Sequence, residues 1–185
     1  MNKNNLDLLD YAIYFATKAH NGQKRKTEID VDMIFHPFTV GMILQRANAS
    51  TNCVIAGILH DVVEDTKYTM EDIKKEFGIE IAEIVEGVSE NKSLPWKERK
   101  IEAIEKVKNA SLDVKLVECA DKISNLETLY SLYQDIGNKI WENFNKPRDE
   151  QKWYYTQMYD AVIYNTEENE LFRRYEKILK QIFEV

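Results

Sequence analysis

The stretch of residues 54–66 constrains this chain more than any other. It is an apolar segment of core quality that is interrupted by four ionisable residues, His60, Asp61, Glu64 and Asp65. Burying such groups in an apolar core is costly unless another group compensates their charge, and a metal ion does so most simply. Residues four apart lie one turn apart on a helix, so these side chains are expected on two neighbouring faces. The stretch therefore predicts a buried active-site helix.

Apolar residues recur every three or four positions through most of the chain, which is the spacing of amphipathic helices. Alternating apolar and polar runs bounded by turn residues, which would indicate strands, are missing from the sequence. The predicted helices cover residues 6–20, a segment that starts at 36, and residues 50–66, 69–78, 79–88, 95–110, 111–133, 149–165 and 167–183. A chain of 185 residues suits one domain with its own core. We therefore expect an all-α, multi-helix fold with a single domain over residues 1–185.

Composition and charge exclude several classes of function. The formal net charge of −7 argues against general nucleic-acid binding, which requires a basic face that displaces counterions from phosphates. The N-terminal residues lack an apolar segment of signal-peptide length, and no later run approaches the roughly 18 apolar residues of a membrane span. Cys53 and Cys119 lie in apolar, helix-like contexts without CxxC spacing. We expect a cytoplasmic protein with buried thiols, no membrane segment and no nucleic-acid partner.

Positive charge is nevertheless concentrated at two places. One is the run from Lys24 to Lys26, and the other comprises Lys97, Arg99 and Lys100. We interpret the second cluster as solvated surface charge. The first lies in a polar segment between two predicted helices, so binding of a small polyanionic substrate there stays possible. Lys24 itself is expected in solvent.

The positions of histidine and aspartate indicate a metal site. His36 begins a predicted helix, the His60–Asp61 pair lies in the central one, and Asp121 interrupts another mostly apolar helix. If these helices pack together, two imidazole nitrogens and two carboxylate oxygens face one ion. This mixed set suits Mn, Fe or Zn better than calcium, which prefers oxygen ligands alone. Sharing the ion is demanding for His60 and Asp61, because adjacent side chains point about 100° apart on an ideal helix.

A series of motifs occurs in a fixed order along the chain. The motifs are Ala19-His-Asn-Gly-Gln23, Arg25-Lys26, His36-Pro37, Leu59-His-Asp-Val-Val-Glu-Asp-Thr66, Phe77-Gly78 and Ala120-Asp-Lys-Ile-Ser-Asn-Leu126. The series resembles that of the HD-domain metal-dependent phosphohydrolases and, more narrowly, the hydrolase domain of the RelA/SpoT group. The chain length is similar to that of the stand-alone small alarmone hydrolases of this group. The match is dense from about residue 11 to residue 126 and thinner afterwards.

This resemblance implies an activity and a ligand set. Members of the group use Mn²⁺ to hydrolyse the 3′-diphosphate of guanosine 3′,5′-bis(diphosphate) (ppGpp) and of its pentaphosphate relative, so a guanosine polyphosphate is the implied small-molecule partner. The resemblance assigns the ion to His36, His60, Asp61 and Asp121, with Fe or Zn as the other metals that this set suits. A bound divalent ion acidifies water and polarises the phosphoryl oxygen that it contacts.

Other positions match the catalytic and substrate contacts of the group. Glu64 and Asp65 match its Glu-Asp pair, and carboxylates beside such an ion can hold the attacking water and accept its proton. Arg25 and Lys26 match positions that contact the nucleotide, where their charge would stabilise the phosphates. Asn125 lies one turn after the aspartate ligand of its helix and can hydrogen-bond the sugar or a phosphate.

The sequence allows two interpretations for the aromatic run near residue 154 and two for His20. The aromatic run from Trp153 to Tyr155 either stacks on a base, for which Tyr155 is our candidate, or belongs to the core, as aromatic stripes on helices do. His20 either orients the basic loop or has a plain structural role.

The chain departs from the group in the segment before His36. There the group often carries a Gly-x-Pro-Tyr element, whereas residues 27–35 read Thr-Glu-Ile-Asp-Val-Asp-Met-Ile-Phe. The acidic side chains of Glu28, Asp30 and Asp32 would repel phosphates if they faced them. Three hypotheses therefore stay open: ppGpp hydrolysis, an HD-domain phosphatase acting on another nucleotide or a phosphorylated dinucleotide cofactor, and a nucleotide sensor without turnover.

Overall fold

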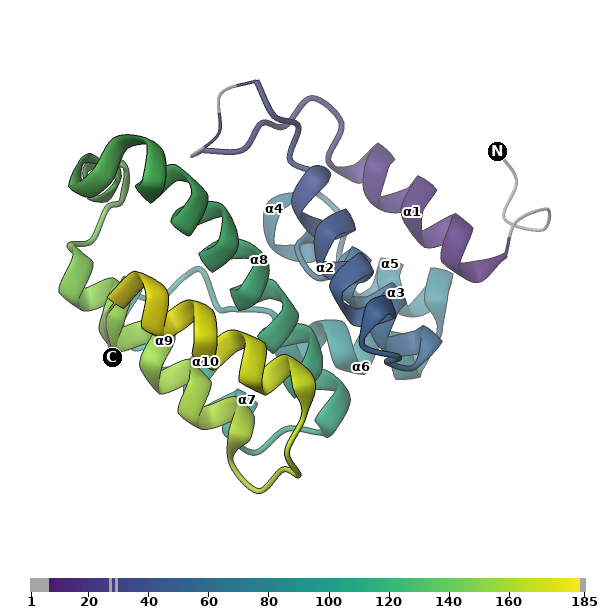
Figure 1. Cartoon of the computed structure of the whole chain (residues 1–185). Coiled ribbons are helices and arrows are strands. Elements are labelled where there is room, and N and C mark those ends of the chain that lie inside the picture. The colour runs from purple at the N-terminus through teal and green to yellow at the C-terminus, as the bar shows by residue number, and fades with distance from the viewer. Residues whose placement is uncertain (1–6, 27, 29, 184–185) are drawn as a thin grey trace.

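Helices account for all the regular structure in the computed structural model, which describes residues 7–26, 28 and 30–183 (Figure 1). The α-helices are α1 (Leu8–Ala19), α2 (Phe35–Arg46), α3 (Thr51–Leu59), α4 (Val62–Asp65), α5 (Met70–Phe77), α6 (Ile79–Val88), α7 (Trp96–Lys108), α8 (Leu112–Ile136), α9 (Arg148–Ile163) and α10 (Glu170–Phe183). A 3₁₀ helix, η2 (Gly137–Asn143), follows α8. The all-α prediction is confirmed. No helix in the described ranges combines the length and apolar character needed to cross a membrane.

Helix α8 lies at the centre of the fold, and its middle is buried on every side. Every residue from Val114 to Ser124 is buried, including charged ones. Helices α2, α3 and α6 pack on one side of it, and α7, α9 and α10 pack on the other (Figure 1). A helix that is buried all round forces its polar side chains to find partners inside the protein. The fold therefore places Asp121, in the middle of α8, in the interior.

Helices α2 and α3 form a tight hairpin that brings two distant histidines together. A Cβ added at Gly57 would lie 2.4 Å from Leu44 Cδ1, and one added at Gly41 would lie 2.5 Å from Ile58 Cγ1. Two glycines thus permit an approach that a larger residue would prevent. Because the helices run in opposite directions, the start of α2 lies beside the end of α3.

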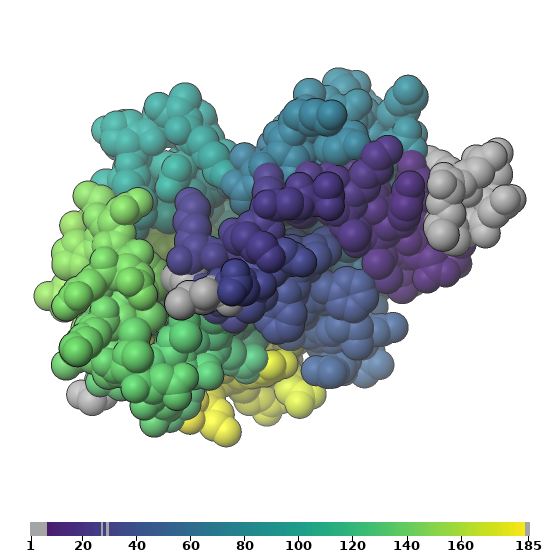
Figure 2. Space-filling model, turned by 90° about the horizontal axis from the view of Figure 1, so that it is seen from above, coloured from purple at the N-terminus to yellow at the C-terminus, as the bar shows by residue number. Residues whose placement is uncertain are grey.

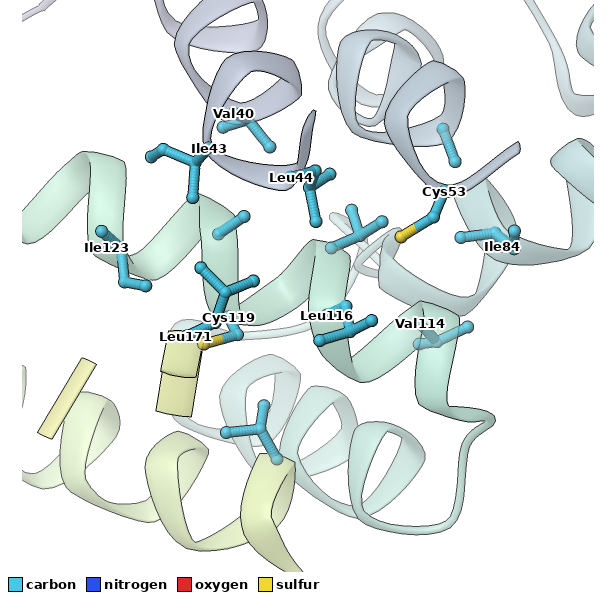
Figure 3. Packing of buried hydrophobic residues seen from close by; sticks show 14 of the residues in the cluster. Val40, Ile43, Leu44, Cys53, Ile84, Val114, Leu116, Cys119, Ile123 and Leu171 are labelled. Carbon is cyan, nitrogen blue, oxygen red and sulfur yellow. The ribbon is translucent and has the colours of Figure 1, made fainter. Parts of the chain in front are cut away.

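The hydrophobic core fills the space between this hairpin and α8. Figure 3 shows Val40, Ile43 and Leu44 of α2 facing Leu116 and other apolar residues of α8. Leu44 and Leu116 are both buried. Cys53 and Cys119 are buried free thiols, as predicted. The core thus fixes α2 and α3 against α8, the three elements that carry the predicted metal ligands.

Local signals in the sequence set most helix ends. The hydroxyls of Ser50 and Ser111 accept hydrogen bonds from the first turns of α3 and α8, and Thr69 and Asp72 form a reciprocal capping box at the start of α5. Gly78 ends α5 with a positive φ of 90°, which glycine adopts at little cost. The predicted starts of α3, α5 and α8 and the predicted end of α5 are confirmed, whereas α8 continues to Ile136, beyond its predicted end at residue 133. Leu6, the predicted first residue of the N-terminal helix, lies outside the described residues.

The prediction of one continuous helix up to Thr66 is wrong. Helix α3 ends at Leu59, the chain turns through His60 and Asp61, and α4 resumes for a single turn. The cause is local: the carbonyl of Gly57, which an uninterrupted helix would use to bind the N–H of Asp61, accepts a hydrogen bond from Nδ1 of His60 at 2.8 Å. His60 and Asp61 keep right-handed helical backbone angles, and their side chains nevertheless meet, with Nε2 of His60 3.2 Å from Oδ1 of Asp61.

The α2–α3 hairpin yields a test of the fold. We expect Gly57→Ala to lower the free energy of unfolding by about 1–3 kcal/mol, because the new methyl group must displace the side chain of Leu44. In a Leu44→Ala background, which vacates that space, the same substitution should cost less than half as much. Urea denaturation of the four proteins measures both values. If Gly57→Ala lowered the free energy of unfolding equally in both backgrounds, the contact between Gly57 and Leu44 would not be what limits the approach of α2 and α3.

Candidate active site

Four predicted ligands from three helical segments converge in the interior. Nε2 of His36, in the first turn of α2, lies 2.9 Å from Oδ1 of Asp121 on α8 and 3.7 Å from Oδ2 of Asp61. Nε2 of His60, at the end of α3, lies 3.2 Å from Oδ1 of Asp61 and 3.7 Å from Oδ1 of Asp121. The two imidazole rings meet edge to face with centroids 5.2 Å apart. The ligating atoms of His36, His60 and Asp121 all lie within 4.8 Å of one another, a grouping that could hold a metal ion.

Hydrogen bonds orient the two imidazoles toward this centre. Nδ1 of His60 donates to the Gly57 carbonyl, so in the neutral imidazole, the form that binds a metal, Nε2 carries the lone pair. Among the described residues this buried Nε2 has no hydrogen-bond partner. Nδ1 of His36 lies 3.0 Å from the hydroxyl of Ser124. An orphaned buried nitrogen beside two carboxylates fits a divalent cation, and the outer hydrogen bonds are those that fix histidine ligands in metal sites.

The carboxylates dominate the electrostatics of this centre. Burial alone would lower the pKa of His60, but Asp61 and Asp121 outweigh it and raise the pKa of this imidazole to about 10. Burial alone would raise the pKa of both carboxyl groups. The imidazoles lower the pKa of Asp61, and Lys122 together with His36 lowers the pKa of Asp121. The centre is therefore a negative site that attracts a cation.

Asp121 is held by a network on its own helix. Its Oδ1 accepts a hydrogen bond from Nδ2 of Asn125 at 2.6 Å, and its Oδ2 accepts one from Nζ of Lys122 at 2.6 Å. The same ammonium lies 2.8 Å from Oε1 of Glu118, which is also buried. Sequence reasoning missed Glu118 and Lys122. Two opposite charges one turn apart in an otherwise apolar helix were the available signal.

The Glu64–Asp65 pair lies on α4, one turn beyond the histidine and aspartate of the turn. Oε1 of Glu64 accepts a hydrogen bond from the backbone N–H of Glu90 at 2.8 Å, and its Oε2 lies 3.5 Å from Nζ of Lys92. The same ammonium contacts the carboxylate of Asp65. Burial raises the pKa of Glu64 above its usual value, although the bond from Glu90 opposes the shift.

The polar segment between α1 and α2 forms a narrow loop. The backbone N–H of Arg25 donates to the carbonyl of Val31 at 2.9 Å. The backbones of Lys24 and Asp32 form an isolated antiparallel β-bridge. The guanidinium of Arg25 contacts Glu28 at 2.9 Å. Glu28 therefore turns back onto Arg25 and neutralises its charge. Thr27 and Ile29, which belong to the departure seen in the sequence, lie outside the described residues.

His20 connects this loop to α4. Nδ1 of His20 contacts Oε1 of Gln23 at 2.8 Å, and the amide nitrogen of Gln23 donates to the carbonyl of Asp65 at 2.6 Å. This chain of contacts is the arrangement expected if His20 orients the basic loop.

Two adjoining cavities connect all these groups. One, of about 410 Å³, is lined by the four predicted metal ligands, Glu64, Asp65 and the predicted substrate contacts. The other, of about 490 Å³, is lined by the basic loop, Met33, Asp65 and Asn125. Figure 2 looks onto this face, where the dark purple loop lies between the teal segment around α7 and the green segment that follows α8. The four substrate-contact candidates, Arg25, Lys26, Asn125 and Tyr155, thus share one cavity with the ligands.

The aromatic run on α9 divides its side chains. Tyr154 and Tyr155 are buried and line the cavity, whereas Trp153 packs against Trp96 and lies under the ammonium of Lys97. Tyr155 is therefore both a core residue and a wall of the cavity, so the structure favours neither interpretation alone.

The interpretation of the second basic cluster as solvated surface charge is wrong for two of its three members. Arg99 and Lys100 are partly buried, line the 410 Å³ cavity and pair with Glu90, whereas Lys97 is exposed. The single sequence gave no signal for this placement, because it depends on how α7 packs against α9.

In the part of the chain that the structure describes, six basic side chains line this cavity. Six acidic side chains line it as well. The basic residues are Arg25, Lys26, Lys92, Arg99, Lys100 and Lys122. A divalent ion would leave the wall with a surplus of positive charge, which suits a polyanion.

Comparison with known proteins identifies the class to which this fold and site belong. The model of the HD domain matches residues 12–144, so the chain belongs to the HD-domain family. This family binds divalent metals.

Individual relatives narrow the comparison. The chain is 37% identical over 131 residues to a zebrafish (Danio rerio) protein named guanosine-3′,5′-bis(diphosphate) 3′-pyrophosphohydrolase MESH1, which is 70% of this chain and 73% of that protein. It is 38% identical over 117 residues to the human (Homo sapiens) protein of the same name, covering 62% and 65%. The match to the Escherichia coli bifunctional (p)ppGpp synthase/hydrolase SpoT is 34% identical over 138 residues but spans only 19% of that protein.

Solved structures share the architecture. A metazoan ortholog of SpoT, described as hydrolysing ppGpp, superimposes with a TM-score of 0.81 and 28% identity, over 97% of this chain and 98% of that chain. A protein of Listeria monocytogenes superimposes with a TM-score of 0.77 and 37% identity, over 81% and 99%.

The contact between Ser124 and His36 gives a test of the metal centre. We expect Ser124→Ala to weaken the binding of Mn²⁺, used as a probe ion, by roughly tenfold, because the imidazole loses the partner that orients it. Calorimetric titration of the purified protein measures the affinity. Ser131→Ala, an exposed serine on the same helix, is the matched control and should leave the affinity unchanged. The same affinity in both variants would mean that the serine does not position this histidine.

Proposed function

We propose that the protein is a metal-dependent hydrolase that removes the 3′-diphosphate from ppGpp and its pentaphosphate relative. One observation carries the proposal: the buried side chains of His36, His60 and Asp121 and the partly buried carboxylate of Asp61 line a cavity whose wall also carries Glu64, Asp65 and six basic side chains among the described residues. The relatives named as pyrophosphohydrolases and the structural match to a protein described as hydrolysing ppGpp support the same activity.

The proposed reaction adds one water molecule to the substrate. The water oxygen forms a bond to the phosphorus that carries the 3′ oxygen, and the bond between that phosphorus and the 3′ oxygen breaks. One proton of the water goes to a protein base, and that proton is passed on to the departing 3′ oxygen, so the protein keeps no net proton. The products are guanosine 5′-diphosphate and pyrophosphate, or guanosine 5′-triphosphate and pyrophosphate from the pentaphosphate. Atoms and charge balance without any further reactant.

His36, His60, Asp61 and Asp121 are the proposed ligands of a Mn²⁺ ion. The unpartnered Nε2 of His60 and the mixed nitrogen and oxygen donors fit Mn²⁺, and also Fe or Zn. When bound, a divalent ion lowers the pKa of a water molecule and neutralises charge on the phosphoryl group.

Glu64 is the proposed proton acceptor. Its Oε1 is fixed by the N–H of Glu90, whereas Oε2 has only the longer contact of 3.5 Å with the ammonium of Lys92 and is the oxygen proposed to take a proton from the attacking water. Asp65 lies beside it. Its carboxylate contacts the ammonium of Lys92, and its backbone carbonyl accepts a hydrogen bond from the amide of Gln23. We propose that Asp65 positions the water and closes the site against the basic loop.

Arg25, Lys26, Asn125 and Tyr155 are the proposed nucleotide contacts. Asn125 gives its amide N–H to Asp121, so its carbonyl oxygen stays available as an acceptor for a sugar hydroxyl. Arg25 can bind a phosphate only if it gives up its contact with Glu28. If it keeps that contact, it can contact the base of the nucleotide instead. Tyr155 presents an aromatic wall on which a base can stack.

The activity has a direct test. We expect purified protein with Mn²⁺ to release pyrophosphate from ppGpp, and His60→Ala and Asp121→Ala to lose the activity by more than about a thousandfold, because each removes a ligand of the ion. An enzyme-coupled pyrophosphate assay measures release, and Ser131→Ala is the control. A panel with other nucleotides and a phosphorylated dinucleotide, assayed for phosphate, separates the alternative substrates. Metal-replete protein that binds ppGpp in calorimetry without releasing pyrophosphate would instead be a sensor.

A further inference from the structure

The carboxylate of Glu90 gathers two cations at the wall of the 410 Å³ cavity. Its Oε2 lies 2.8 Å from Nε of Arg99, and its Oε1 accepts a hydrogen bond from Nζ of Lys100 at 2.6 Å. The hydroxyl of Tyr154 is 3.4 Å from the same Oε1. Two positive charges share one negative charge, so this group carries a surplus of one positive charge. We call it the Glu90 group, meaning Glu90, Arg99 and Lys100.

The neighbouring charged groups have the opposite balance. The ammonium of Lys122 lies between the carboxylates of Glu118 and Asp121. The ammonium of Lys92 contacts both Glu64 and Asp65. Each of these groups carries a surplus of negative charge. Arg25, on the loop, is balanced by a single carboxylate, that of Glu28. Of these ion-paired groups in the described residues, the Glu90 group alone has positive charge to spare.

The Glu90 group also lies next to the proposed reaction centre. The backbone N–H of Glu90 holds Oε1 of Glu64, the proposed proton acceptor. Arg99 and Lys100 line the cavity that holds the predicted metal ligands, whereas the 490 Å³ cavity is lined by the basic loop and not by either residue, among the residues the structure describes. The positive charge of the Glu90 group therefore lies in the cavity of the predicted metal ligands, which Arg25 and Lys26 also line, and not in the second cavity along the loop.

Both cations retain donors for an anion. An ammonium has three N–H donors and a guanidinium has five. Glu90 accepts one N–H of Lys100 and lies 2.8 Å from Nε of Arg99. Lys100 is only partly exposed, so a contact made there is poorly screened by water. Glu90 neutralises only one of the two positive charges of Arg99 and Lys100. A phosphate with negative charge would neutralise the other.

We propose that Arg99 and Lys100 bind the terminal phosphate of the 3′-diphosphate and so select a diphosphate over a monophosphate at that position. This inference rests on the proposed function and adds the residues that recognise the group to be removed. Neither residue takes part in a bond change. After hydrolysis the same contacts hold the pyrophosphate product.

A purely structural role for the two residues predicts a different result when Glu90 is changed. If Arg99 and Lys100 only anchor Glu90, Glu90→Gln breaks the same interaction as Lys100→Gln and has the same effect. If they bind phosphate, Glu90→Gln removes a competing carboxylate and frees both cations. The sign of the Glu90→Gln effect therefore separates the two roles.

Calorimetric titration with inorganic pyrophosphate, with Mn²⁺ at equal concentration in cell and syringe, tests the site without turnover. We expect Lys100→Gln to weaken pyrophosphate binding about tenfold or more, since it removes a charge-assisted contact. Lys100→Arg, which keeps the charge, should restore most of the affinity, and Glu90→Gln should bind at least as tightly as the unchanged protein. Lys97→Gln removes the same charge from an exposed position of α7, over the ring of Trp153, and should have no effect.

Several results would overturn the inference. These are an unchanged protein that does not bind pyrophosphate, equal losses in Lys97→Gln and Lys100→Gln, and a Glu90→Gln variant that loses as much affinity as Lys100→Gln. Circular dichroism of each variant establishes that it is folded before the titration is interpreted.

Kinetics distinguish failure of this inference from failure of the proposed function. For ppGpp we expect Lys100→Gln to raise KM by tenfold or more, with a smaller change in kcat, whereas KM for a guanosine 5′-diphosphate with a single 3′-phosphate should change less than twofold. Equal KM effects on the two nucleotides would contradict the inference and leave the hydrolase activity intact. Pyrophosphate binding without any release from ppGpp by the unchanged protein would contradict the proposed function and leave the anion site intact.

Discussion

The structure depends on one constraint: α8 is buried on every side although its sequence carries charged residues. Such a helix is stable only if each charge finds a partner, because an unpaired buried charge costs several kcal/mol. Lys122 meets this requirement by lying between Glu118 and Asp121, and Asn125 adds a hydrogen bond to Asp121. The same contacts fix the carboxylate that faces the two imidazoles. Stability of the core and geometry of the site thus have a common cause.

The hairpin of α2 and α3 supplies the other half of that geometry. Its helices approach closely because glycines face larger side chains across the contact, which places His36 and His60 side by side at the open end of the hairpin. The short turn after α3 then directs Asp61 toward the same point. Basic and acidic side chains on the surrounding wall are equal in number among the described residues, so a divalent ion, once bound, would make the cavity positive and suited to an anion.

Much of this could be predicted from the sequence, and the limits have physical reasons. Helix type and most helix ends follow from apolar spacing and from caps such as Ser50, Ser111 and the Thr69 capping box, which act locally. The convergence of His36, His60 and Asp121 could be proposed because each interrupts an apolar run. The break at His60 could not, since it depends on a side chain that competes for a backbone carbonyl.

Long-range packing accounts for the remaining gaps. The placement of Arg99 and Lys100 inside the cavity depends on the packing of α7, and the pairing of Glu28 with Arg25 depends on how the loop folds back. A single sequence contains no local signal for either contact. The roles of Glu64, Asp65 and the nucleotide contacts stay predictions, now with defined neighbours.

We propose that His36, His60, Asp61 and Asp121 together hold one divalent ion. Crystals of the protein loaded with Mn²⁺ and measured at the manganese absorption edge test it most directly, because anomalous scattering locates the ion itself. We expect a single strong peak among the two Nε2 atoms and the two carboxylates, and its loss in Asp121→Asn. A peak at Glu64 and Asp65 with none at the histidines, or one that persists at the histidines in Asp121→Asn, would contradict it.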